Sequence, residues 1–311
     1  MGKILSSRAL LIVMTIVTIS CTKSNDLDTL FGKRVRFETN IVTTDLAVRV
    51  ADNVWEAQDA IGVYVFEEES ENVVERLKNV EYITKTGGIS GSFVAKDRNI
   101  CFPDNGDRVR FMSYYPYNSQ TTSNIYKIDV SNQSNQAAID LLYSFDKEAV
   151  YDGTVLNKAI PLNFDHKLAK IVINIKVGDG LKGTDLENLK IFLSGLDTKA
   201  DFDLIEGKLS NRTAITEITP FKQLTAQDGF NVGYEAIVIP TDGKPKDAKI
   251  VLGLKNVSEV DINSDSFSWA FDNVLLGSYK YTYNIIIKRS EIIVLGLIDD
   301  WSKGEEDISV Q

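Results

Sequence analysis

The residue type best suited to catalysis occurs once in the chain, as His166. A nucleophilic serine or cysteine is usually activated by a neighbouring imidazole, so any such catalytic pair must use this histidine. His166 lies at a polar corner, Asp165-His166-Lys167, between two apolar segments. A histidine that satisfies the backbone of a turn fits this position better than a general base does, and we expect a structural role.

The chain also lacks the residues that a metal or cofactor site of the usual kinds needs. Beside His166 the chain holds two cysteines, Cys21 and Cys101, too few for a transition-metal site of the usual kind. The turn at residues 104–107 lacks the closing glutamate of a calcium loop, and no Gly-rich phosphate loop occurs. The 44 Asp and Glu leave a glycosidase-type carboxylate pair open, although none stands out. We expect no enzyme, no cofactor and no metal site.

Three tryptophans, Trp55, Trp269 and Trp301, are the remaining candidates for a binding surface. Exposed, coplanar indoles would form a platform for sugar rings. Each tryptophan lies among alternating apolar residues, which favours a place in the core instead. The net charge of −10 without a basic cluster excludes a nucleic-acid partner.

The elements that would position these residues are short strands. Ile160, Leu162 and Phe164 alternate with polar residues, and the alternation resumes from Ile171 to Val177 after the corner. Residues 60–66 are apolar throughout, which predicts a strand buried on both faces. Similar runs recur at residues 35–40, 82–84, 92–94, 109–113, 189–193, 233–239, 248–254, 279–287 and 291–297. Because few segments carry a helical period, the pattern predicts an all-β chain of antiparallel sandwiches.

The N-terminus has the form of an export signal. Lys3 and Arg8 precede an apolar run at residues 9–19, which is short for a membrane span, and Ser20-Cys21 follows at once. This order predicts a lipoprotein signal with Cys21 as the acylated residue, which would anchor the protein without a transmembrane helix. Cleavage of a plain signal peptide is the alternative. With Cys21 acylated, Cys101 would be a buried, inert thiol without a partner.

Residues 291–298 (EIIVLGLI) are apolar on both faces of a strand, with charged residues at each end. An antiparallel strand on a surface is usually polar on one face, and a bare apolar edge invites aggregation. The segment is therefore either a central strand of its own sheet or an element that contacts another chain.

Several phrases, taken in order, resemble the fimbrillin family of Bacteroidota, the Mfa-like lipoproteins that supply type V pilus subunits. They cover most of the chain from about residue 36 to residue 304. The phrases are Trp55-x-x-x-Asp59-x-Ile61-Gly62-Val63, Phe111-x-x-Tyr114-Tyr115-Pro116-Tyr117, Asp140-Leu141-Leu142-Tyr143, Leu162-x-Phe164-x-His166-x-Leu168-Ala169-Lys170, Ala236-x-Val238-x-Pro240 and Ile298-x-x-Trp301-x-x-Gly304.

The resemblance implies two tandem antiparallel β-sandwich domains of transthyretin-like topology after a lipoprotein signal peptide. We accordingly divide the chain into a signal peptide at residues 1–20 and a linker and processing region at 21–35. An N-terminal sandwich would span residues 36–157 and a C-terminal sandwich residues 158–311.

The resemblance also implies assembly by strand donation. In such fimbriae a trypsin-like protease cuts after an arginine near the first strand, and a strand of the next subunit fills the groove that opens. Arg34 and Arg36 are the expected processing sites, with Arg49 as second choice. Head-to-tail pairing of this kind makes a filament, because it does not close.

We therefore expect a structural or adhesive subunit of a type V fimbria at the outer membrane and cell surface. Its partners would be other fimbrial subunits, the outer membrane through the lipid anchor, and a ligand on a host or bacterial surface. The alternative is a monomeric glycan-binding lipoprotein of the outer-membrane surface, which exposed coplanar tryptophans would favour.

Replacement of the expected lipid-bearing residue, Cys21→Ser, should release the protein from the membrane fraction, because the only predicted anchor is lost. Detergent phase partitioning of the wild type and the variant measures this. Equal partitioning of the two proteins into the detergent phase would contradict lipidation at Cys21.

Overall fold

A computed structural model of the chain describes residues 34–41, 54–67, 72–103, 106–121, 123–149, 159–213, 216–254 and 266–301. Strands dominate these ranges, and the helical elements within them are short 3-10 turns at Glu75–Leu77 and Gly183–Leu186. The expected all-β class is confirmed. None of the helices among the described residues has the length and apolarity of a membrane span.

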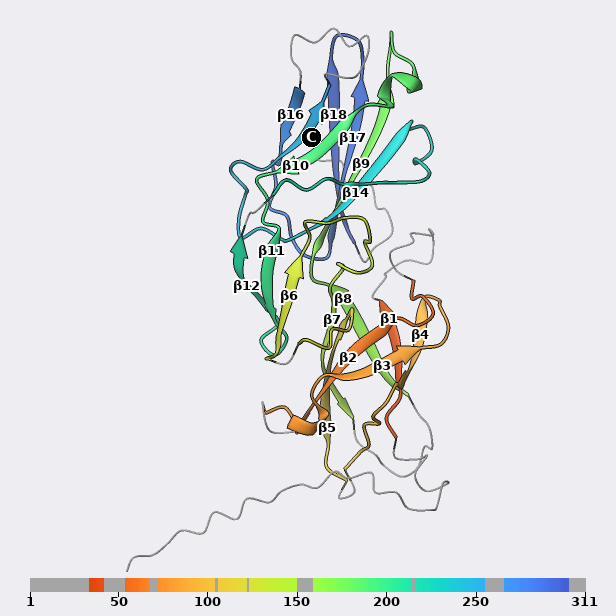
Figure 1. Cartoon of the computed structure of the whole chain (residues 1–311), viewed down its shortest axis with the longest axis vertical. Coiled ribbons are helices and arrows are strands. Elements are labelled where there is room, and N and C mark those ends of the chain that lie inside the picture. The colour runs from red at the N-terminus through yellow and green to blue at the C-terminus, as the bar shows by residue number, and fades with distance from the viewer. Residues whose placement is uncertain are drawn as a thin grey trace, which may run out of the picture.

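One end of the molecule is a β-barrel, drawn in red to yellow-green in Figure 1. Within the described ranges it closes in the order β1-β4-β3-β2-β5-β7-β8. All neighbours are antiparallel except β1 and β8, whose parallel pairing completes the circle. The strands are β1 (Phe37–Ile41), β2 (Ala60–Glu67), β3 (Val80–Thr84), β4 (Ser90–Ala95), β5 (Val109–Tyr115), β7 (Leu142–Ala149) and β8 (Ile160–His166).

Aromatic side chains fill the barrel. Along β1 and β8 buried and exposed residues alternate, so one face of each strand lines the interior. Phe37 of β1 makes edge-to-face contacts with Tyr82 and Phe111, at ring-centroid distances of 5.0 and 5.3 Å. Trp55 is likewise held by Phe164, at 5.5 Å. Such contacts add to the free energy of apolar burial, so the interior depends on well-fitted rings.

A three-stranded sheet covers the outside of the barrel along β2 and β5. Its order is β12-β11-β6, with β6 at Ile125–Asp129, β11 at Lys199–Asp203 and β12 at Lys208–Thr213. The outward residues Tyr64 and Tyr114 share a buried cluster with Tyr126 and Phe202 of this sheet. Gly62 lets the Tyr114 ring lie against β2, because a Cβ at this position would stand 2.2 Å from the ring. Burial of β2 on both faces is thus confirmed.

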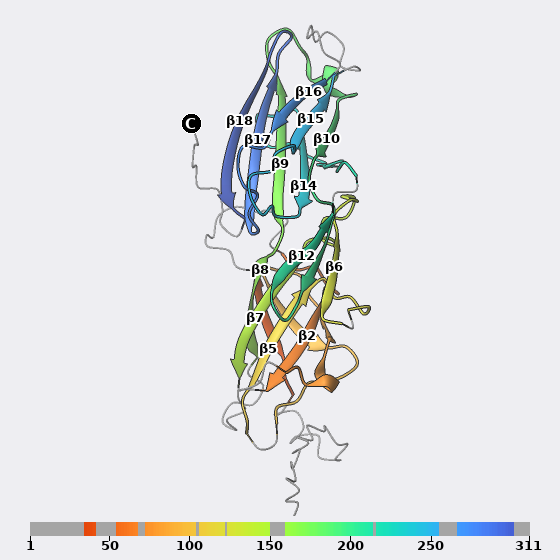
Figure 2. The same cartoon turned by 90° about the vertical axis from the view of Figure 1, so that its left-hand side faces the viewer.

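The other end of the molecule holds two further sheets, which Figure 2 shows in cyan, green and blue. In the described part, one has the order β13-β14-β9-β17-β18 and the other β10-β15-β16. The strands of the first are β13 (Phe221–Lys222), β14 (Val232–Val238), β9 (Ala169–Val177), β17 (Tyr279–Ile287) and β18 (Ile292–Asp300). Those of the second are β10 (Lys190–Ser194), β15 (Lys249–Gly253) and β16 (Ser266–Ala270). Ile173 of β9 and Ile250 of β15 belong to one buried cluster.

The architecture differs in detail from two tandem antiparallel sandwiches. The first unit is a closed barrel, and two strand pairs, β1 with β8 and β9 with β17, are parallel. Pairings also connect residues on either side of position 157: β8 pairs with β1 and β7, and β6 pairs with β11. The physical reason is the continuous buried cluster that runs from the outer face of β2 and β5 into the second pair of sheets.

Phe164 is fully buried in the barrel, as the alternation along β8 predicts. Phe164→Ala should lower the free energy of unfolding by about 3–5 kcal/mol, through lost apolar burial and the cavity that remains. Urea unfolding followed by fluorescence measures the change. Leu224→Ala is the control, because Leu224 is 100% exposed and its loss should change stability by less than about 0.5 kcal/mol. Equal stability of Phe164→Ala and the wild type would contradict the core assignment.

Candidate functional site

The strand that closes the barrel, β1, is five residues long and lies between two partners. It is antiparallel to β4, where Phe37 faces Phe93, and parallel to β8, where Phe37 faces Ile160. Val35, Phe37, Thr39 and Ile41 are buried, whereas the residues between them point outward. A strand held by its backbone and one apolar face can be replaced by another strand of the same pattern.

The expected processing sites Arg34 and Arg36 both precede β1. Arg34 forms an isolated β-bridge with Cys101, and Arg36 is exposed. A cut after either arginine would therefore leave the whole of β1 in the barrel. Arg49, the second choice, lies between β1 and Trp55, outside the described residues, as does Cys21. A cut after Arg49 would separate β1 from the rest of the chain.

The expectation for Cys101 is not met. Its side chain is half-buried rather than buried, and the sulfur is disulfide-bonded. The prediction of a thiol without a partner followed from the expected acylation of Cys21.

The apolar segment near the C-terminus forms β18, and of the two alternatives the central strand is wrong. Among the described residues β18 pairs only with β17, which makes it an edge strand. Its residues are half-buried to exposed along most of its length, and Leu295 is 56% exposed. The even positions, from Ile292 to Ile298, pair with inward residues of β17, whereas the odd positions face away.

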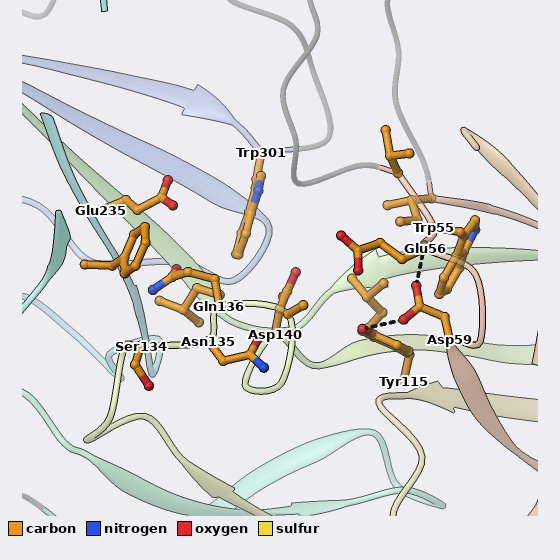
Figure 3. Close-up of a pocket in the computed structure, with 16 residues that line it drawn as sticks. Trp55, Glu56, Asp59, Tyr115, Ser134, Asn135, Gln136, Asp140, Glu235 and Trp301 are labelled. Carbon is orange, nitrogen blue, oxygen red and sulfur yellow. Dashed lines mark hydrogen bonds between the residues drawn. The ribbon is translucent and has the colours of Figure 1, made fainter. Parts of the chain in front are cut away.

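A pocket of about 400 Å³ lies where the rim of the barrel meets β13 and β14 (Figure 3). The barrel contributes the end of β1, residues 54–59 and Tyr115, whereas the opposite side is formed by Glu235, Ile237 and Trp301. The segment 134–140, which precedes β7, forms the floor in this view. Its walls thus come from segments far apart in the sequence, which no local motif could reveal.

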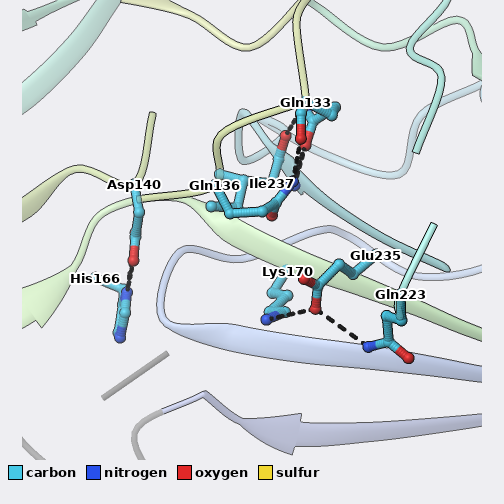
Figure 4. A network of polar contacts seen from close by, with 8 residues as sticks. All are labelled: Gln133, Gln136, Asp140, His166, Lys170, Gln223, Glu235 and Ile237. Atoms are coloured by element: carbon cyan, nitrogen blue, oxygen red, sulfur yellow. Dashed lines mark hydrogen bonds and ion pairs between the residues drawn. The ribbon is translucent and has the colours of Figure 1, made fainter. Parts of the chain in front are cut away.

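His166 supports one wall of this pocket. Its buried ring stacks on Trp301, with centroids 3.9 Å apart, and its Nδ1 lies 2.9 Å from Asp140 Oδ2 (Figure 4). Lys170 is also buried, and its Nζ lies 2.9 Å from Glu235 Oε2. These contacts give His166 a structural role through the Asp140 carboxylate and the Trp301 ring, whereas the sequence predicted a bond to the backbone of a turn. The sequence does not reveal that Lys170 is covered, because its partner Glu235 comes from a distant strand.

The tryptophans divide into two kinds. Trp55 and Trp301 are 1% and 3% exposed, which confirms their place in the core and removes them from any exposed, coplanar platform. Trp269, expected in the core as well, is half-buried on β16. It lines a groove of about 540 Å³ with residues of β17 and β18. The difference arises because β16 is the edge strand of its three-stranded sheet.

Asp59 and Glu56 place two carboxylates on the barrel side of the pocket. Asp59 accepts hydrogen bonds from the Glu56 N–H at 2.7 Å and from the Tyr115 hydroxyl at 3.1 Å. Burial raises the pKa of Asp59 above its ordinary value, the charge of Glu56 adds to the rise, and the two hydrogen bonds act against it. Neither carboxylate has a cationic partner among the described residues.

Comparison with known proteins places the chain in a family. A model of the fimbrillin-like family matches residues 48–301, and the chain belongs to this family. A relative from Bacteroides uniformis, described as fimbrium subunit Fim1C, is 32% identical over 262 residues, 82% of each chain. The family is one of fimbrial structural subunits and not of enzymes.

Two solved structures share the fold. A protein from Bacteroides uniformis described as a cell adhesion protein is 26% identical, with a TM-score of 0.69, over 86% of this chain and 98% of its own. Another from Bacteroides ovatus is 20% identical, with a TM-score of 0.66, over 88% and 99%, and shows the fold alone. The match to the family model begins after β1, so the closing strand lies outside the matched region.

Asp59→Asn should change how stability depends on pH. Because the pKa of Asp59 is raised on folding, its carboxyl group favours the folded state most at pH values below the unfolded pKa. This contribution is lost as the pH rises through the folded pKa. The stability of Asp59→Asn relative to wild type should therefore increase from about pH 3.5 to pH 7. Urea unfolding across this range, with the exposed Asp228→Asn as control, measures it, and a flat or falling difference would contradict the assignment.

Proposed function

We propose that the chain is the precursor of a fimbrial subunit that assembles head to tail by strand donation, with β1 as the strand that leaves. The observation that carries this proposal is the position of β1. It is a short strand, it closes the barrel, and it lies at the N-terminal end of the described chain. The fimbrillin-like family and the relative described as a fimbrium subunit support an appendage at the cell surface.

Departure of β1 would open a groove between β4 and β8. The ring of Phe37 contacts Tyr82 and Phe111, and the Thr39 hydroxyl donates to the carbonyl of Gly91 at 3.2 Å. Once β1 has left, the rings of Tyr82 and Phe111 and the Gly91 carbonyl would be exposed to water, as would the backbone edges of β4 and β8. An apolar groove flanked by two unpaired strand edges strongly favours capture of a replacement strand.

Arg49 is the processing site that fits this role. Cleavage there frees β1 from the chain that continues at Trp55, whereas cleavage after Arg34 or Arg36 trims the segment ahead of β1 and leaves the barrel closed. The match to the family model from residue 48 onward supports the same division, because it covers the part of the chain that a cut after Arg49 would retain.

The edge strand β18 of a neighbouring copy supplies a donor of matching pattern once it leaves β17, because its even positions pack against the core of its own chain in the uncleaved protein. Val35, Phe37, Thr39 and Ile41 enter the barrel at every second position, with the small Thr39 third. The even positions of β18 repeat this spacing with the smallest residue, Gly296, also third. At this site space is tight, because a Cβ on Gly91 would lie 3.0 Å from Thr39 Oγ1. The odd positions would place Leu297 there instead.

Lipidation at Cys21 remains part of the proposal, and it determines the chemical state of Cys101. A sulfur in a thioether to lipid cannot also form a disulfide. Cys101 is disulfide-bonded in the structure, and the sequence contains no cysteine other than these two. The lipidated protein must therefore carry Cys101 as a thiol, which alkylation of the unfolded protein without reductant would detect by mass.

Trypsin-like cleavage of the purified precursor should produce ladders that survive mild detergent on gel electrophoresis. Arg49→Gln should abolish the ladders, whereas the matched double variant Arg34→Gln with Arg36→Gln should still form them. Deletion of residues 291–311 removes β18 together with the buried Trp301; where its melting curve shows a folded protein, that protein should be cleaved and cap ladders without extending them. Melting curves check the fold of each variant.

Two outcomes would contradict the proposal. If the cleaved wild type stays monomeric, strand donation loses its support. If the Arg34 and Arg36 double variant fails to polymerise while Arg49→Gln succeeds, cleavage acts ahead of β1 and the closing strand is not the one that leaves.

A further inference from the structure

The indole of Trp301 is held where the barrel meets the sheet that contains β18. Its ring stacks on that of His166, with centroids 3.9 Å apart and an angle of 11° between the planes. Its backbone N–H donates to the carbonyl of Ser278 at 2.6 Å, and the residue is 3% exposed. Trp301 directly follows β18, whose residues from 292 to 298 are half-buried to exposed. The segment that would be donated is therefore buried chiefly at its C-terminal end.

The wall on which the indole stacks belongs to the barrel. His166 ends β8, and its Nδ1 lies 2.9 Å from Oδ2 of Asp140, which precedes β7. Both residues stay in the barrel when β18 leaves, because neither is part of that strand. Departure of Trp301 would uncover the His166 ring, now 1% exposed, and the ammonium group of Lys170, which lies 5.9 Å from the centre of the indole. The barrel would then present an aromatic site whose ring is already held in place.

The register of β1 leads an incoming strand towards this site. β1 runs parallel to β8, and its last residue, Ile41, lies beside Phe164. In the alignment proposed above, Ile298 of the donor takes the place of Ile41. His166 lies two residues past Phe164 on β8, and Trp301 lies three residues past Ile298 on the donor. A donor that continues in the same register therefore brings its own Trp301 to the level of the residue after His166.

The spacing of the two sites also fits. Three residues of extended chain span about 10 Å. Ile41 and Trp301 line the same pocket of about 400 Å³, the first from the barrel rim and the second from the opposite side (Figure 3). The end of the β1 site and the indole site thus open into one space, which an incoming chain can cross.

From this arrangement we infer that the His166 site receives the Trp301 of a second copy of the chain. In the precursor the site holds the Trp301 of its own chain, and in the fibre it holds that of the donor. This inference rests on strand donation as proposed above, and it adds a second contact between the two copies.

One site for two indoles has a consequence for the order of assembly. Docking of the donor expels the acceptor's own Trp301, which releases the acceptor's β18 for the next copy. In the uncleaved chain β1 fills the path along β8, so no donor reaches the site and β18 stays on β17. Cleavage therefore opens the acceptor first, and each filled acceptor becomes the next donor.

Two single-cysteine chains test the contact between copies. One carries Asp300→Cys and the other Lys167→Cys, both with Cys21→Ser and Cys101→Ser. In the inferred register the two positions are neighbours on adjacent strands, close enough for a disulfide. After cleavage and mixing, mild oxidation should join them into a species of dimer mass on a denaturing gel. The uncleaved mixture should stay unlinked, as should a cleaved mixture in which Lys208→Cys, at an exposed position of β12, replaces Lys167→Cys.

A peptide of residues 291–301 tests the indole itself. Added to the cleaved wild type during assembly, it should fill acceptor sites and stop the growth of ladders. The same peptide with Trp301→Ala should need at least about a tenfold higher concentration, because it leaves the His166 ring uncovered. A peptide with Leu297→Ala is the control, because this residue faces away from the core, and it should act like the unaltered peptide.

The same pair of peptides on altered acceptors locates the contact. On cleaved His166→Ala the unaltered and the Trp301→Ala peptides should act within about twofold of each other. His166→Phe keeps a ring for stacking and should restore the difference. Melting curves check the fold of each acceptor, and if His166→Ala is unfolded the cross-link decides.

The outcomes separate this inference from strand donation. If the cleaved wild type forms no ladders and no peptide acts on it, strand donation fails and the inference fails with it. If ladders form without the cross-link, or if the Trp301→Ala peptide acts as well as the unaltered one, strands are exchanged but each His166 site keeps its own indole. A difference between the peptides that persists on folded His166→Ala would place the donor's indole elsewhere. Either of the last two results would overturn the inference and leave strand donation standing.

Discussion

The parallel pairing of β1 with β8 is the contact on which the barrel depends. Every other junction in the described barrel joins antiparallel neighbours, and without β1 the sheet would be an open, curved surface with Tyr82, Phe93 and Phe111 uncovered. A five-residue strand thus closes a core that six other strands build. Because β1 comes before the other six barrel strands in the chain, it could leave without breaking the connection between any two of them.

Much of this fold follows from residue patterns. The period of two along β8 predicts which of its residues enter the core, and the continuous apolar run of β2 predicts its burial on both faces. In β9 the alternation predicts Ile171, Ile173 and Ile175, but Lys170 and Asn174 on the other face are buried as well. The pattern cannot show what covers the second face of β2. The strands β6, β11 and β12 cover this second face, and they come from either side of the chain's midpoint. Strand order depends on such long-range contacts, and a local pattern does not encode it.

The candidate sites show the same limit. His166 was predictable as a structural residue because it is the only histidine and lies at a corner, but its partners Asp140 and Trp301 come from two distant segments. Arg34 and Arg36 have the right residue type and approximate position for processing. Whether a cut after them would remove β1 depends on the residue at which the strand begins. Residues 35–41 all share one alternation, so the sequence does not fix the first residue of the strand to within a few positions.

The connection between β8 and β9 has a mechanical consequence. Only Lys167 and Leu168 separate the end of β8 from the start of β9, and these two strands make the parallel pairings with β1 and β17. In a fibre in which β18 leaves β17 and fills the β1 site of the next copy, a pulling force would pass along β8, β9 and β17 and then through the connection at residues 288–291 into β18. Strands that lie along the direction of pull must break their hydrogen bonds together and not one by one. These strands would therefore carry most of the tension when the subunit is stretched, and its surface loops would carry little of it.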